Sequence, residues 1–200
     1  MVMYTQDHHI EVAVLERSKN NGEYCGDAHT IINTDDYVVC AVIDGLGSGE
    51  GASESAQAAA EGVKQDHHLT VKEIVEKCNH ALLNKRGAVL TVVKLDLKER
   101  KISYSNVGNI GFTMYNPNGT AVQPISRRGY LCGRNEKIQE SHYHYDEGTI
   151  FILYSDGVAS PPPKLTLLEI NSLCENNNRI FDAAKYVDND DVTLLIGKLK

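Results

Sequence analysis

The chain has 200 residues, of which 42% are hydrophobic and 24% are charged, and its formal net charge at pH 7 is −7. This length suits one domain with a substantial core, and we expect a single catalytic domain over residues 1–200. The acidic balance, with no basic run longer than Arg127-Arg128, offers little to neutralise a phosphate backbone. Nucleic acid is therefore not an expected partner.

No segment has the pattern of a membrane span or a secretion signal. The longest apolar runs fall well short of the roughly 20 residues that a span needs, and residues 1–17 carry acids and histidines early. The five cysteines are widely spaced and include no Cys-x-x-Cys pair, which disfavours a disulfide framework and a zinc knuckle. We expect a cytoplasmic monomer with reduced thiols and no membrane partner.

The first elements are predicted to be strands. Residues 10–15 read as a strand, and residues 28–33, after a polar turn rich in Asn and Gly, read as its return partner. The run at 37–43 is continuously apolar and β-branched, which predicts a strand buried on both faces. This strand ends at Asp44.

Two helices are predicted next, over residues 51–65 and 71–84. The second places its apolar side chains on one face, and Thr70 with Glu73 forms a capping box at its start. From residue 87 the period of the hydrophobic pattern changes from that of a helix to that of a strand.

The second half of the chain is predicted to be rich in hairpins. Paired strands are expected at 88–96 with 101–106, at 110–115 with 120–124, and at 137–145 with 149–154. A basic, Gly-containing loop spans 126–135. Helices at 165–174 and 180–186 and a last strand at 192–199 complete a mixed, largely antiparallel α+β architecture.

Four short segments place carboxylates at strand ends or in tight turns: those that contain Asp27, Asp44, Asp156 and the pair Asp190-Asp191. A lone Asp-Gly is usually an ordinary turn, but an unpaired charge directly after a buried apolar run is expensive. Several acids close together repel one another unless a cation lies among them. The segments therefore predict a metal site.

The expected ligands are all oxygens, because no His or Cys lies at zinc-site spacing, and this favours Mg²⁺ or Mn²⁺ over Zn²⁺. Gly45 lets its backbone carbonyl approach an ion closely. Two ions about 3.5–4 Å apart stabilise the attacking and leaving oxygens of a displacement at phosphorus. The chemistry predicted is phosphoester hydrolysis without a covalent enzyme intermediate.

Six short motifs occur at residues 26–29, 42–47, 87–88, 105–109, 155–157 and 190–195. Their order is that of metal-dependent protein phosphatases of type 2C, and the chain resembles that family over nearly its whole length. The resemblance implies a four-layer α-β-β-α sandwich with two largely antiparallel sheets. Within that family, the small size of the chain and its segments 44–49 and 84–88 make it most similar to bacterial phosphatases of stress signalling.

The resemblance also implies roles for individual residues. Asp44 would bridge two ions, the Gly45 carbonyl and Asp27 would act at the first ion, and Asp156 and Asp190 would bind the second. Asp190 is preferred over Asp191, although a shift of one residue would exchange them. Asp27 and Asp44 are the expected catalytic residues.

Two positions depart from the family pattern. Asn109 stands where many relatives have an acid that helps to bind a third ion, so a third ion is not expected. Arg17 matches the family's phosphate-binding arginine only loosely. Arg127, Arg128 and Arg134, in the basic loop, are candidates to bind substrate phosphate or an acidic partner, with a solvated loop as the alternative.

The resemblance implies that the substrates are phosphoserine or phosphothreonine in proteins of the stressosome, its scaffold or antagonist proteins, and that the enzyme restrains a general-stress sigma-factor pathway. Two alternatives remain. Residues 44–49 also resemble the Asp-x-Gly-x-Gly box of ATPases related to histidine kinases, which would make the chain an ATP-binding signalling ATPase. The other is a catalytically inactive, phosphatase-like binding module.

Overall fold

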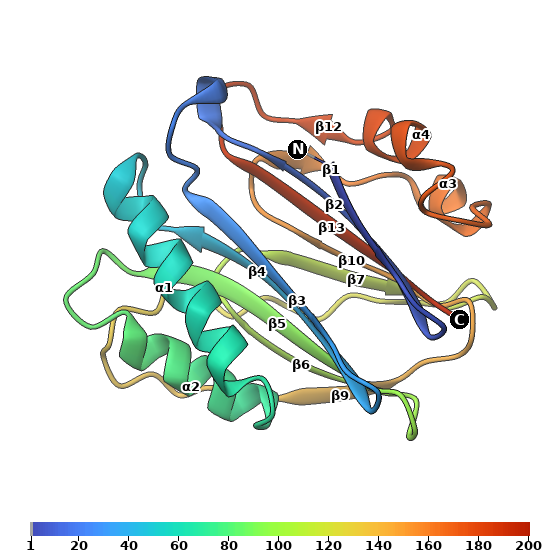
Figure 1. Ribbon diagram of the computed structural model, residues 1–200, viewed down its shortest axis with the longest axis horizontal. Helices are drawn as coiled ribbons and strands as arrows, with labels where there is room; N and C mark the ends of the chain where they lie inside the picture. Colours follow the sequence, from blue (N-terminus) through green and yellow to red (C-terminus); the bar gives the residue numbers. More distant parts are fainter. Residues whose placement is uncertain (1) are drawn as a thin grey trace.

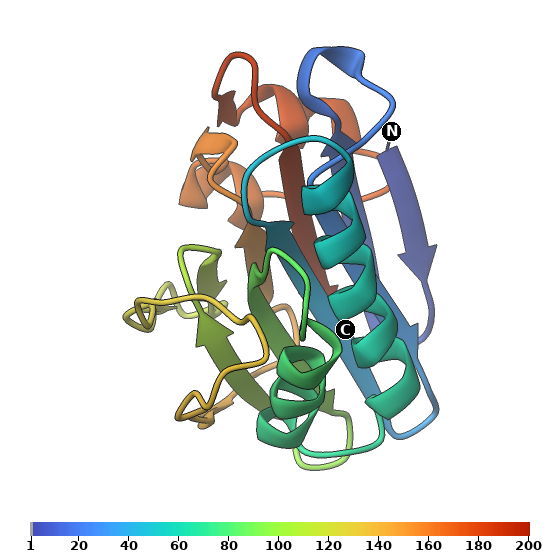
Figure 2. The same ribbon diagram turned by 90° about the vertical axis from the view of Figure 1, so that its left-hand side faces the viewer.

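The computed structural model describes residues 2–200, and two antiparallel sheets lie face to face in it (Figures 1 and 2). The five-stranded sheet has the order β3 (Asp27–Asn33), β4 (Tyr37–Gly45), β5 (Ala88–Asp96), β6 (Lys101–Val107) and β9 (Ser141–His144). The six-stranded sheet has the order β1 (Val2–Gln6), β2 (Ile10–Arg17), β13 (Val192–Leu199), β10 (Ile150–Tyr154), β7 (Gly111–Tyr115) and β8 (Ala121–Val122).

β4 shows how the apolar pattern specifies the layers. Val38 and Val42 belong to the core between the two sheets, whereas Val39 and Ile43 belong to the core beneath the helices. All four side chains are fully buried, and they alternate because successive side chains of a strand point to opposite faces. The predicted strand buried on both faces is confirmed.

Helices cover both outer faces of the sandwich. α1 (Glu50–Asp66) and α2 (Val71–Ala81) pack on the five-stranded sheet, and Thr70 with Glu73 makes the predicted capping box. α3 (Lys164–Leu168) and α4 (Asn177–Asp182) cover the six-stranded sheet through a third core. The predicted four-layer α-β-β-α fold is thus confirmed. None of the helices within residues 2–200 is both long enough and apolar enough to span a membrane.

The predicted pairing of strand 10–15 with strand 28–33 is wrong. β2 pairs with β1 and β13, and β3 pairs with β4 in the other sheet. The short connection between β3 and β4 closes a hairpin at Thr34, whose hydroxyl and amide both bond to Tyr37. The longer connection after β2, which contains a 3-10 turn (Lys19–Asn21), instead carries the chain from one sheet to the other.

The predicted hairpin of 137–145 with 149–154 is also wrong. β9 pairs with β6, whereas β10 pairs with β7 and β13 in the opposite sheet, so the turn near Thr149 crosses between sheets. The late helices end earlier than predicted: α3 ends at Leu168, not at residue 174, and α4 begins at Asn177 and ends at Asp182, not at residue 186. A small two-stranded sheet of β11 (Val158–Ser160) and β12 (Lys185–Tyr186) was not predicted.

Gly45 allows α1 to lie against the end of β4. A Cβ atom on Gly45 would lie 2.0 Å from the carbonyl oxygen of Ala52, so Gly45→Ala must displace the helix. We expect a loss of about 3 kcal/mol in the free energy of unfolding, measured by urea denaturation in EDTA. Gly22→Ala is the control and should lose much less stability, because the site is exposed with extended backbone and a Cβ there would lie 3.1 Å from the Lys19 carbonyl oxygen. Equal stability of the two variants would contradict this role of Gly45.

Candidate metal centre

A cavity of about 310 Å³ gathers the predicted carboxylates. Five of its lining residues are aspartates, Asp27, Asp44, Asp156, Asp190 and Asp191, and the others are Leu46, Gly47, Val89 and Asn109. The aspartates come from β3, from β4, from the turn after β10 and from the turn before β13. Segments far apart in the sequence therefore meet at one site.

Asp27 and Asp44 face each other across the β3–β4 hairpin. The register pairs these two residues directly, and the amide of Gly45 donates to the carbonyl of Gly26 at 2.9 Å just beyond them. Like charges directly opposite each other on paired strands repel. The strand register itself therefore imposes a repulsion that a cation would relieve.

Asp156 is brought to the same place by contacts in the other sheet. The Ser155 amide donates to the Thr193 carbonyl at 3.0 Å, and the Thr193 amide donates to the Ser155 hydroxyl at 2.9 Å. A Cβ atom on Gly157 would lie 1.9 Å from the carbonyl oxygen of Asp191. Only glycine permits this approach, which sets Asp156 beside the Asp190-Asp191 turn.

Burial and mutual repulsion raise the pKa values of two of these carboxyl groups. Burial is the largest cause for Asp27, whose pKa rises to about 7, and neighbouring Asp191 and Asp156 add to it. Burial also raises the pKa of Asp44, to about 8, with contributions from Asp27, Asp156 and Asp190. Each group therefore favours a proton, or another positive charge, near neutral pH.

The donor set fits a hard divalent cation. Asp27 is only 2% exposed, and its Oδ2 is buried without a hydrogen-bond partner among the described residues. All the charged lining groups are carboxylates, and oxygen ligands of this kind suit Mg²⁺ or Mn²⁺. Within residues 2–200, no three His, Cys, Asp or Glu side chains are already arranged to coordinate one metal ion. The aspartates therefore line the same cavity without forming a complete set of ligands around one point.

The two adjacent aspartates before β13 differ in their contacts. Asp191 is 8% exposed, and its Oδ1 accepts a hydrogen bond from the Lys19 amide at 2.8 Å. Its Oδ2 lies 2.8 Å from where a Cβ on Gly26 would be. Asp190 is less buried and accepts from the Asp191 amide at 3.0 Å. Asp191 thus ties the β2–β3 connection to β13, which leaves Asp190 the freer of the two.

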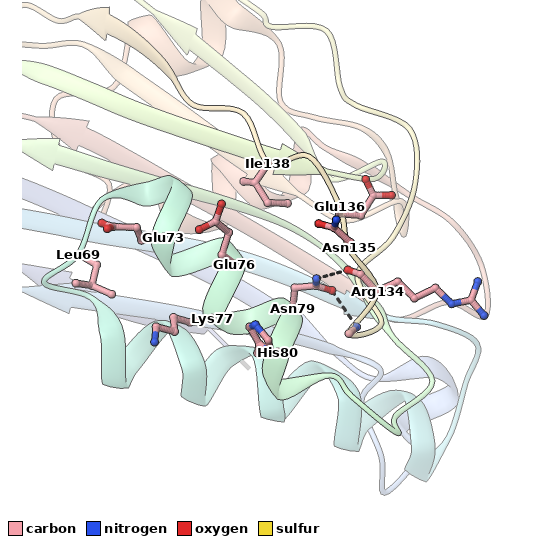
Figure 3. A pocket seen from close by; sticks show the side chains of 11 residues that line it. Leu69, Glu73, Glu76, Lys77, Asn79, His80, Arg134, Asn135, Glu136 and Ile138 are labelled. Atoms are coloured by element: carbon pink, nitrogen blue, oxygen red, sulfur yellow. Dashed lines mark hydrogen bonds between the residues drawn. The ribbon is translucent and has the colours of Figure 1, made fainter.

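The arginines predicted to bind substrate are not among the residues that line this cavity. Arg127 pairs with Glu136 at 3.5 Å, and its backbone amide donates to Asn106 Oδ1 at 2.9 Å. Arg128 is exposed. Arg134 lines a separate cavity of about 780 Å³ between α2 and the basic loop, and its guanidinium extends away from the other lining side chains (Figure 3).

Three lining residues were not predicted as part of the site. Val89 lies opposite Asp44 on β5, and Leu46 and Gly47 follow Gly45 directly. The sequence held a signal for the last two, since they continue the motif at 42–47. It held none for Val89, because that residue reaches the cavity through strand pairing.

Comparisons with known proteins agree with this geometry. The family model described as Stage II sporulation protein E (SpoIIE) matches residues 34–200. The chain is 32% identical to the phosphoserine phosphatase RsbX of Bacillus subtilis (strain 168) over 201 residues, which is 100% of each chain. A crystal structure of RsbX in complex with magnesium superimposes with a TM-score of 0.92 over 100% of both chains.

Two other solved structures share the fold. One, solved in the context of the bacterial stressosome, is 26% identical, has a TM-score of 0.83, and is matched over 94% of this chain and 98% of its own. The PP2C phosphatase domain of SpoIIE from Bacillus subtilis, solved with a fragment of its regulatory domain, has a TM-score of 0.76 at 13% identity, and the match covers 99% of this chain and 70% of that one. The α-β-β-α sandwich is therefore that of PP2C phosphatases.

The raised pKa of Asp44 predicts how the stability of the metal-free protein depends on pH. At pH values between 3.8, the ordinary pKa of an aspartate, and about 8, the raised pKa of Asp44, this carboxyl holds a proton in the folded state and loses it on unfolding. Stability in EDTA should therefore fall by a few kcal/mol as pH rises through this window. In Asp44→Asn the fall should be smaller, because the raised pKa of Asp44 no longer contributes to it.

Urea denaturation in EDTA at several pH values measures this dependence. Asp35→Asn, at an exposed turn position, is the matched control and should follow the wild type. A wild-type stability that stays constant or rises across the window would contradict the assigned electrostatics.

Proposed function

The chain belongs to the SpoIIE family and is a metal-dependent phosphatase with the PP2C fold, and on this premise we propose that it hydrolyses phosphoserine or phosphothreonine in stress-signalling proteins. One observation carries the proposal: five aspartates from distant segments line one cavity. Full-length similarity to a phosphoserine phosphatase supports the choice of substrate. We propose one phosphatase domain across residues 1–200.

In the proposed centre, Asp44 would be shared by two Mn²⁺ or Mg²⁺ ions, and Asp27 and the Gly45 carbonyl would hold the first. Asp156 and Asp190 would hold the second. When bound, the ions lower the pKa of a water molecule and stabilise charge on the phosphoryl oxygens. The protein contributes the spacing of the carboxylates, because β3–β4 pairing fixes Asp27 against Asp44 and the packing at Gly157 fixes Asp156.

The choice of Asp190 over Asp191 rests on their contacts. Asp191 is already bonded to the Lys19 amide, whereas Asp190 retains more freedom to turn toward an ion. Two ions per chain are proposed, since Asn109 supplies an amide where a third ion would need a carboxylate.

An ATP-binding ATPase is a weaker reading of the same segment. Such an enzyme has no need for Asp156 or Asp190, yet both line the cavity with Asp44. The glycine-rich segment 47–52 superficially fits a dinucleotide-binding turn, but α1 is followed by α2 and β5 runs antiparallel to β4, which disfavours such a site. An inactive binding module would not need to retain the whole set of carboxylates.

The proposed partners are phosphorylated proteins of the stressosome, its scaffold or antagonist proteins. Similarity to RsbX and to a structure solved in the context of the stressosome supports this choice. On this proposal the enzyme is a cytoplasmic monomer that acts as a negative regulator of a general-stress sigma-factor pathway.

Phosphate release tests the function directly. With Mn²⁺ or Mg²⁺ the wild type should release phosphate from phosphoserine and phosphothreonine peptides, and EDTA should abolish the release. Asp44→Asn should lower kcat/KM by at least about 1,000-fold, since it removes the carboxylate shared by both ions. Asp35→Asn is the control for loss of one negative charge. Activity that persists in EDTA or in Asp44→Asn would refute the mechanism.

The basic loop is proposed to contact the substrate protein outside the cavity, through Arg127, Arg128 and Arg134. Arg128→Glu should raise KM for a phosphoprotein by a factor about five times larger than the factor for a small aryl phosphate. Arg128 lies outside the cavity, so its charge acts on the surface of a protein substrate and not on a small one. Arg100→Glu, beyond the far end of β5, is the matched control. Equal effects on the two substrates would remove the loop from the substrate-binding surface.

A further inference from the structure

Asn109 makes a direct contact with one of the carboxylates of the cavity. Its Nδ2 donates a hydrogen bond to Asp156 Oδ2 at 2.9 Å, and both side chains line the cavity. The donor must be the amide nitrogen, because an ionised carboxylate only accepts hydrogen bonds. One oxygen of Asp156 is thus engaged by the protein, and Oδ1 stays available to the cavity.

Asp156 is the carboxylate that most needs such a contact. It is exposed, whereas Asp27 and Asp191 are buried and Asp44 is partly buried. An exposed side chain exchanges between rotamers, and ordering it on binding a ligand costs free energy. A fixed donor at the cavity reduces that cost, because it selects the orientation before an ion arrives.

The turn that carries Asn109 is itself firmly held. The buried Asn106 donates through Nδ2 to the Thr91 hydroxyl at 2.7 Å and to the Ile110 carbonyl at 3.2 Å. Ile110 directly follows Asn109, and just before Asn109 the Gly108 amide donates to the Arg127 carbonyl at 2.7 Å. Asn109 is therefore presented from a backbone that is anchored at both ends.

From these contacts we infer that Asn109 is a positioning residue of the metal centre, which holds the Asp156 carboxylate at the cavity and so increases affinity for the second ion. This inference rests on the proposed function, because it assigns Asp156 to that ion. Groups that orient metal ligands typically change metal affinity by about 10–100-fold when they are removed.

Titration calorimetry with Mn²⁺ tests the inference in the full chain. Asn109→Ala should weaken the second Mn²⁺ site about tenfold, while the melting temperature in EDTA stays at the wild-type value. The Mn²⁺ concentration for half-maximal phosphate release should rise by a similar factor, and KM for the phosphopeptide at saturating Mn²⁺ should change much less. Asn178→Ala, an exposed asparagine on α4 and outside the aspartate cavity, is the matched control.

The other results separate the possible failures. Unchanged Mn²⁺ affinity in Asn109→Ala would overturn the inference. A loss of melting temperature in EDTA that accompanies the loss of affinity would show a structural role instead. A raised KM with unchanged affinity would show that Asn109 contacts the substrate. If the wild type itself binds no Mn²⁺, the proposed metal centre is refuted, and the role inferred for Asn109 is refuted with it.

Discussion

The repulsion between Asp27 and Asp44 is the constraint on which the site depends. Strand register places these residues opposite each other, and burial removes Asp27 from water and Asp44 from part of it. Nothing in the local sequence favours such a pair energetically. The surrounding structure must therefore hold it, and it does so through β4, which is packed between two cores along its length.

Two close backbone contacts assemble the remainder of the site. Gly45 brings α1 against the end of β4, and Gly157 brings the turn after β10 against Asp191. The same dipeptide, Asp-Gly, thus serves in both sheets to set a carboxylate next to a tightly packed backbone. Both positions need glycine because a Cβ atom at either one would collide with a backbone carbonyl oxygen.

The sequence was informative where a feature depends on local pattern. The alternation along β4, the capping box at Thr70 and the placement of Asp44 and Asp156 after apolar runs were all readable from it. Strand pairing was less accessible, because neighbours in the chain can belong to opposite sheets, as β9 and β10 do. The position of the basic loop was inaccessible for the same reason, since it depends on contacts with Asn79 and Asn106.

Charge, more than volume, identifies the functional site in this fold. The cavity between α2 and the basic loop is more than twice as large as the aspartate cavity, yet it mixes acids with Lys77 and Arg134. There opposite charges can compensate one another within the protein. At the aspartate cavity they cannot, because its charged lining groups all have one sign. Such a cluster of like charges destabilises the metal-free protein. A bound cation removes the repulsion, and the free energy that this releases contributes to the affinity for the ion.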